Sequence, residues 1–180
     1  MIINKMTVSR LKNLSFLLLF CLITACGDTA KSTANKPFGN CKFGAPKAIF
    51  NPQIPKVTQH TFQLNAQSAV EKVQFDGGIA LELIQSGCEK PKQEFQFTIP
   101  TSTSNFKDED WLAMGVDLLG FMGSTDPGLQ PFLLWQGALK DKIGQLKIGL
   151  PHQLEPGFFV KIDKVAAADS GLLILSLYQE

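Results

Sequence analysis

The chain has 180 residues, a formal net charge of +1 and 18% charged side chains. A chain so close to neutrality has no electrostatic basis for binding nucleic acid. Its glycines match neither a Walker loop nor G-x-G-x-x-G, which argues against nucleotide binding through those motifs.

Residues 1–25 have the three zones of an export signal. The first zone is basic and has no acidic residue, with Lys5, Arg10 and Lys12. The apolar run 14–22 that follows has the length of a signal-peptide core and is too short to span a bilayer. Ile23-Thr24-Ala25-Cys26 then resembles the lipobox of bacterial lipoproteins, with an aliphatic residue, two small residues and a cysteine. The resemblance implies cleavage before Cys26 and attachment of lipid to its sulfur.

The lipoprotein resemblance also implies a location. In enteric-type bacteria, aspartate directly after the lipidated cysteine retains the protein at the inner membrane, whereas Gly27 occupies that position here. We therefore expect a lipid-anchored protein on the periplasmic face of the outer membrane, with a Gram-positive cell surface as the alternative. Acyl chains contribute about 0.8 kcal/mol per buried CH₂, so several chains anchor a protein stably. The charged residues in the predicted leader are all basic, so we expect the mature chain to be slightly acidic.

Residues 26–40 are small, polar and poor in aliphatic side chains, which predicts a flexible tether. Residues 41–180 have the length of a single globular domain, and we expect this domain to be rich in β-structure. It contains two cysteines, Cys41 and Cys88. An even pair in an oxidising compartment predicts a disulfide. A metal or redox pair is the alternative, but neither C-x-x-C spacing nor a nearby histidine supports it.

The first half of the domain alternates apolar and polar residues, as half-buried strands do. His60, Phe62 and Leu64 share one face of the segment 58–65. The same pattern predicts further strands at 70–75, 79–84 and 94–99, with a turn at Asp76-Gly77-Gly78. Three or four antiparallel strands with one polar face explain these segments.

An apolar helix is predicted near 108–122, because the acidic residues 108–110 precede an apolar run that ends at Gly123. One stripe of this helix carries Trp111, Met114, Leu118 and Met122. Burial in the core is one interpretation of the stripe. The alternative is an exposed contact with a protein partner or a lipid. Gly115 and Gly120 weaken the helix but allow close packing.

The segments 132–139 and 143–150 fit either a helix or a strand, and their glycines favour strands. The segments 158–162 and 172–178 predict two strands joined through 166–171 into a C-terminal β-hairpin. The predicted fold is therefore α+β: a mostly antiparallel sheet, arranged as a sandwich or an open barrel-like structure, with one inserted helix.

Catalytic signals are weak. His60 lies on the apolar face of a predicted strand, and His152 lies in a proline-flanked loop near Glu155, so an ordinary structural role explains each. G-x-S-x-G, H-E-x-x-H and a Cys/His cluster are all missing from the sequence. The acidic residues 108–110 lack the spacing of an EF-hand loop. We therefore predict neither catalytic residues nor a metal nor a cofactor.

These observations predict a non-catalytic binding or assembly module whose partner is another envelope protein. Inhibition of an envelope hydrolase is one form that such a function could take. The first alternative is a carrier of lipid or another hydrophobic ligand, with a phenylalanine-lined cavity between sheet and helix. The second is an enzyme that uses His152 or His60 as a base.

Overall fold

The structure of the chain is a computed structural model, and it describes residues 38–180. The predicted leader, the predicted lipobox with Cys26 and most of the predicted tether lie outside the described residues.

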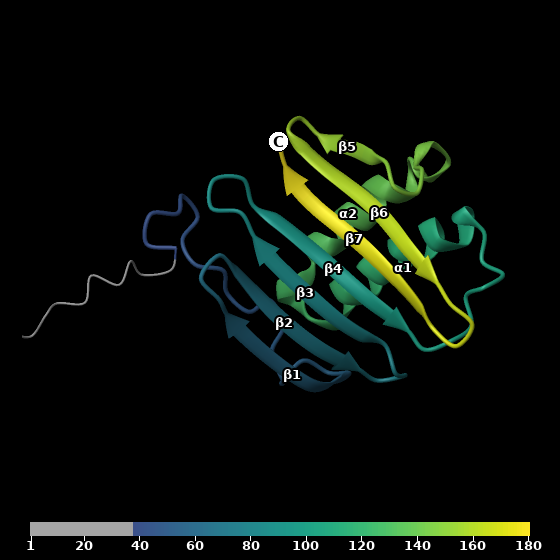
Figure 1. Ribbon diagram of the computed structural model, residues 1–180, viewed down its shortest axis with the longest axis horizontal. Coiled ribbons are helices and arrows are strands. Elements are labelled where there is room, and N and C mark those ends of the chain that lie inside the picture. Colours follow the sequence, from purple (N-terminus) through teal and green to yellow (C-terminus); the bar gives the residue numbers. More distant parts are fainter. Residues whose placement is uncertain (1–37) are drawn as a thin grey trace, which may run out of the picture. The chain divides into compact units, whose positions relative to one another are not determined.

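Within residues 38–180, seven antiparallel strands form one open sheet, and this part of the chain is α+β as predicted (Figure 1). The strands are β1 (Val57–Leu64), β2 (Ser68–Phe75), β3 (Ala80–Ser86), β4 (Lys92–Ile99), β5 (Pro151–Glu155), β6 (Phe158–Ala166) and β7 (Gly171–Gln179). Their order is β1-β2-β3-β4-β7-β6-β5, so the last strand lies in the middle of the sheet. The predicted C-terminal hairpin is confirmed as β6 and β7, and the sheet does not close into a barrel.

The described part of the chain has two α-helices, inserted between β4 and β5, which lie behind the sheet in Figure 1 and cover one of its faces. They are α1 (Asp108–Thr125) and α2 (Pro131–Lys140), joined by the 3₁₀ turn η1 (Pro127–Leu129). A second 3₁₀ turn, η2 (Ile143–Gln145), follows α2. The strands that face this helical layer supply alternate apolar residues to the core, as a pleated sheet with one buried face requires. Phe95, Phe97 and Ile99 are buried, which confirms the predicted alternation of β4.

The strand interpretation of 132–139 is wrong, because these residues form α2. Pro131 occupies the first turn, where its fixed φ and missing N–H favour a helix start. Phe132 and Leu139 lie two turns apart on the same face of the helix, and both are buried. Gly137 lies in open space and does not break the helix, so the glycine content was a poor guide here.

The segment 143–150 is not a strand either: η2 and a turn fill it, and the strand β5 begins only at Pro151. His152 therefore lies in a strand and not in the predicted loop. The structure also has two helices in place of the single predicted one. Helix α1 continues through Gly123 to Thr125, three residues beyond its predicted end at residue 122.

Glycines bring α1 and α2 into close contact. A Cβ on Gly120 would lie 2.0 Å from the side-chain amide of Gln136, and a Cβ on Gly123 would lie 2.7 Å from Leu133. Helix α1 also packs closely on the sheet, where a Cβ on Gly115 would lie 3.3 Å from Ile162. The prediction that Gly115 and Gly120 permit close packing is therefore confirmed.

The predicted disulfide is present: Cys41 is bonded to Cys88, with the two Cα atoms 4.6 Å apart. It ties the segment before β1 to the loop between β3 and β4. We call residues 41–56 the N-terminal arm. Phe50 and Ile54 of the arm are buried, so the arm contributes to the core.

The helix contact gives a test of the fold. Gly123→Ala should lower the free energy of unfolding by about 1–3 kcal/mol, because the new methyl group overpacks the contact with Leu133. Gly137→Ala is the matched control in α2 and should raise stability by roughly 0.5–1 kcal/mol, since its Cβ meets no atom. Urea unfolding measures both. Equal effects of the two changes would contradict the close helix crossing.

Candidate functional site

The face of the sheet opposite the helices carries a band of paired charges across β4 and β6. Antiparallel register places Ser176 of β7 between Glu94 and Lys161, and Ile174 between Gln96 and Asp163. We call the following set the charged strip: Lys92, Glu94, Gln96, Lys161 and Asp163. Its residues are all partly buried and lie on β4 and β6, the two strands that flank β7 in the sheet.

Short polar contacts hold the charged strip. The Nζ of Lys92 lies 2.8 Å from Oε2 of Glu94, and the side-chain amide of Gln96 donates to Oε1 of Glu94 at 2.7 Å. Lys161 and Asp163 form a second ion pair at 2.9 Å. Each charge therefore has a partner, and the side chains are held in place before any ligand arrives.

These contacts also fix the charge of Glu94. The hydrogen bond from Lys92 holds the pKa of Glu94 below its usual value of 4.5, against the opposing effect of partial burial. The stabilisation by this carboxylate is thus present above pH 4.5 and is lost as the pH falls through the lower pKa of the folded chain. The hydrogen bond and charge of Asp163 raise the pKa of Lys161. The negative charge on Glu94 and the positive charge on Lys161 consequently persist through neutral pH.

A shallow hollow of about 360 Å³ lies over the charged strip. Ile174, Ser176 and Tyr178 of β7 form its floor together with the charged residues. The rings of Phe159 and Tyr178 stack beside it, with their centroids 5.8 Å apart. The site therefore combines fixed charges of both signs with an aromatic surface.

A second hollow lies beside α1 and has a volume of about 590 Å³. We call it the α1 groove, and its lining residues are Ile79, Phe106, Asp110, Ala113, Met114, Asp117, Leu118 and Phe121. The groove is open to solvent and mainly apolar, with two carboxylates at its border.

The stripe predicted on the helix is divided between the core and this groove. Trp111 and Met122 are completely buried, and Leu118 is 5% exposed. Only Met114 and Leu118 line the α1 groove. The stripe is thus mainly a core feature, and it is not an exposed contact over its full length.

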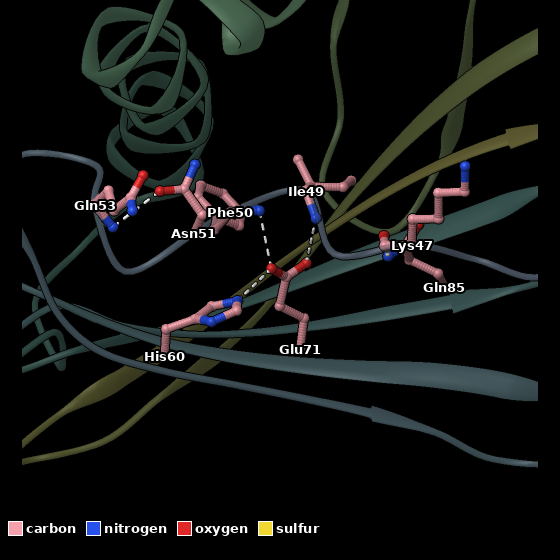
Figure 2. A network of polar contacts seen from close by, with 8 residues as sticks. All are labelled: Lys47, Ile49, Phe50, Asn51, Gln53, His60, Glu71 and Gln85. Carbon is pink, nitrogen blue, oxygen red and sulfur yellow. Dashed lines mark hydrogen bonds and ion pairs between the residues drawn. The ribbon is translucent and has the colours of Figure 1, made fainter.

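His60 belongs to a buried polar network on the helical side of the sheet (Figure 2). The carboxylate of Glu71 is fully buried and accepts three hydrogen bonds. The backbone N–H groups of Ile49 and Phe50 donate at 2.8 Å each, and Nε2 of His60 lies 2.7 Å from Oε1. This network pins the N-terminal arm to β2.

Sequence reasoning missed Glu71, although its position carried a signal. Ala69, Val73 and Phe75 occupy the same face of β2 and are buried. A lone carboxylate in such an alternation must be paired or must bind a ligand, because an unpaired buried charge is very unfavourable. Here its partners come from the arm and from β1, which the sequence of β2 alone does not identify.

His152 lies on β5, opposite Val160 of β6. Its Nε2 atom is buried and has no hydrogen-bond partner among residues 38–180. His60 and His152 are the two histidines of the chain, and both share the helical side of the sheet with their strand partners Val73 and Val160. The charged strip lies on the other side.

Within the described part of the chain, no group of three or more metal-binding side chains could hold an ion. No helix in the same residues is long and apolar enough to cross a membrane. Comparison with family models, with curated proteins and with solved structures finds no match for this chain.

The buried network can be tested through stability. Glu71→Ala should lower the free energy of unfolding by on the order of 3 kcal/mol, since it leaves two backbone N–H groups and His60 without their acceptor. Glu82→Ala is the control, because Glu82 forms only a surface pair with Lys72, worth about 0–1 kcal/mol. Urea unfolding compares the two variants. A loss for Glu71→Ala no larger than that of the control would show that the network does not hold the arm.

Proposed function

We propose that the chain is a lipid-anchored module on the periplasmic face of the outer membrane that binds an envelope protein through the charged strip. One observation carries the proposal. Within residues 38–180, the helices pack on a single face of the sheet, and the opposite face presents ordered ion pairs beside stacked aromatic rings.

The chemistry of the charged strip favours a protein partner. Positive and negative groups alternate within it, so a uniformly charged polymer would meet repulsion at every second group. A protein surface can present the complementary alternation, and such complementarity supplies specificity and fast association. Tyrosine is enriched in the buried centres of protein interfaces, and Tyr178 lies next to the charges. Because the side chains are already paired, binding requires little additional ordering.

The same residues fit binding better than catalysis. A general base works best when its pKa lies near the working pH. The pKa of Glu94 is lowered, which moves this carboxylate away from that range. The histidines lie on the opposite side of the sheet, where His60 is engaged by Glu71.

The anchor rests on the lipobox and is tested at Cys26. Cys26→Ala should abolish incorporation of labelled palmitate and should release the protein from the membrane fraction or leave its precursor uncleaved. Cys21→Ala is the control, because Cys21 lies within the apolar run and is removed with the leader. Palmitate labelling and the mass of the mature protein report the result. Unchanged labelling of Cys26→Ala would refute lipidation at this residue.

The binding site is tested by photo-crosslinking in living cells. A photoreactive phenylalanine analogue in place of Tyr178 or Phe159 should give one dominant protein adduct after purification under denaturing conditions. The same analogue in place of Leu134 serves as the control, since that side chain is 75% exposed on α2 and remote from the strip. Glu94→Lys should abolish the adduct at Tyr178, because it places a third cation beside Lys92 and Lys161. Mass spectrometry identifies the adduct, and strong adducts at Leu134 alone would refute the role of the charged strip.

The α1 groove favours a second candidate, a carrier of lipid or another hydrophobic ligand. The groove is bordered by half-buried Met114 and Phe121, and its volume of about 590 Å³ could accept part of an acyl chain. Phospholipid retained by the natively purified protein, together with no protein adduct at Tyr178, would support the carrier over the binding module.

A further inference from the structure

The two edges of the sheet differ in how they are protected against pairing. At one edge, β5 has five residues, begins at Pro151 and is followed by Pro156. At the other, β1 has eight residues and contains no Asp, Glu, Lys, Arg or proline. Short strands, prolines and charges are the usual means of preventing edge-to-edge association. The edge at β5 has these features, and the edge at β1 lacks them.

The hairpin between β1 and β2 determines which backbone groups face outward. Asn65 donates its N–H to Ser68, so these residues form a hydrogen-bonded pair at the end of the ladder. Such pairs alternate along antiparallel strands. Gln63 and Thr61 therefore bond to β2, whereas the N–H and C=O groups of the residues between and beside them point away from the sheet. The outward-facing residues are His60, Phe62 and Leu64.

These outward groups have no backbone partner in the described part of the chain. Leu64 is 44% exposed, and Thr61 and Gln63 are exposed on the other side of the strand. The edge of β1 thus combines free donors and acceptors with a partly exposed apolar side chain.

We propose that β1 pairs with β1 of a second copy of this chain, antiparallel and about a twofold axis at Phe62. This register places Phe62 opposite Phe62 of the second copy and His60 opposite Leu64. Each of the three outward residues of one copy then lies opposite an outward residue of the other copy. Every free backbone N–H and C=O of these residues therefore gains a hydrogen-bond partner. Because β1 has no Asp, Glu, Lys or Arg, and His60 lies opposite Leu64, the symmetric contact places no like charges opposite each other.

The sequence of β1 favours its own copy as the occupant. An added strand needs backbone bonding along the edge and side chains that match the alternation of its neighbour. Apolar Phe62 and Leu64 alternate with uncharged polar Thr61 and Gln63, so the same strand in reverse direction supplies that match. A twofold axis also closes the assembly, because each copy uses the same edge, that of β1, for the contact.

The pairing has a structural consequence. A twofold axis that relates neighbouring antiparallel strands is perpendicular to the sheet, so both open faces point to the same side of the joined sheet. The two charged strips would then be presented together. This pairing does not depend on what the charged strip binds.

Paired cysteines test the register in full-length protein in cells. In the proposed register, Thr61 lies opposite Gln63 of the second copy as a non-hydrogen-bonded pair, with Cα atoms about 4.5 Å apart. This distance is within the range of a disulfide. Two differently tagged copies, one carrying Thr61→Cys and the other Gln63→Cys, should form a reducible dimer that contains both tags. Each variant expressed alone places its cysteines diagonally, about 7–8 Å apart, and should form far less dimer.

The control for chance collision is Gln153→Cys on the protected edge at β5, paired with itself. Mixed dimer at or below the level of this control would overturn the proposal. A reducible adduct whose partner is a different protein would also overturn it, because the edge would then be occupied by that protein.

A second variant separates loss of pairing from loss of folding. Leu64→Pro removes only an outward N–H, so it should leave the ladder with β2 intact and abolish the mixed dimer. Leu64→Ala keeps the N–H and should retain the dimer. Circular dichroism of both variants checks the fold, and a dimer that persists in folded Leu64→Pro would refute main-chain pairing. These measurements detect contacts between copies, so a negative result would refute the β1 pairing and would not affect the crosslinking result at Tyr178. A negative crosslinking result at Tyr178 would likewise not affect the β1 pairing.

Discussion

The close packing of helix α1 on the middle of the sheet is the contact on which the rest of the structure depends. Trp111, Leu119 and Met122 are completely buried in the core that α1 shares with the sheet. At Gly171 a Cβ would lie 2.6 Å from the ring of Trp111, so the backbone of β7 directly supports the indole. Gly120 and Gly123 then allow α2 to approach α1 from its other side. Helix α1 is apolar on most of its surface, and it can bury this surface because it contacts the sheet on one side and α2 on another.

This arrangement divides the polar groups of the sheet into two kinds. On the helical side, the carboxylate of Glu71 is fully buried and is held by three hydrogen-bond partners. Two of them are backbone amides of the N-terminal arm, which the disulfide also restrains at Cys41. On the opposite side, the charges of the strip remain partly solvated and interact mainly with their neighbours on adjacent positions. A buried group of the first kind supports the fold, whereas groups of the second kind remain available to a partner.

Much of the fold could be predicted because the strands alternate with a period of two. The faces of β4 and β1 were predicted correctly, since Phe95, Phe97 and Phe62 lie among polar neighbours. Helix α2 was missed because its pattern is short and contains Gly137, while its stabilisation comes from contacts of Phe132 and Leu139 with the core. Tertiary packing overrides a weak local preference of this kind. The disulfide could be predicted because Cys41 and Cys88 are the two cysteines of the predicted domain.

The sequence by itself determined the alternating strands, the cysteine pair and the start of the apolar helix, because each depends on local periodicity or on a count of residues. It also contains Ile23-Thr24-Ala25-Cys26, and the proposed lipid anchor depends on the resemblance of these residues to a lipobox. Only the tertiary structure decided which face of the sheet the helices cover and which residues meet across strands. Glu94 and Lys161 are 67 positions apart, and no local pattern relates them. They lie in one row because β7 enters the sheet between β4 and β6, and strand order results from packing of the whole chain.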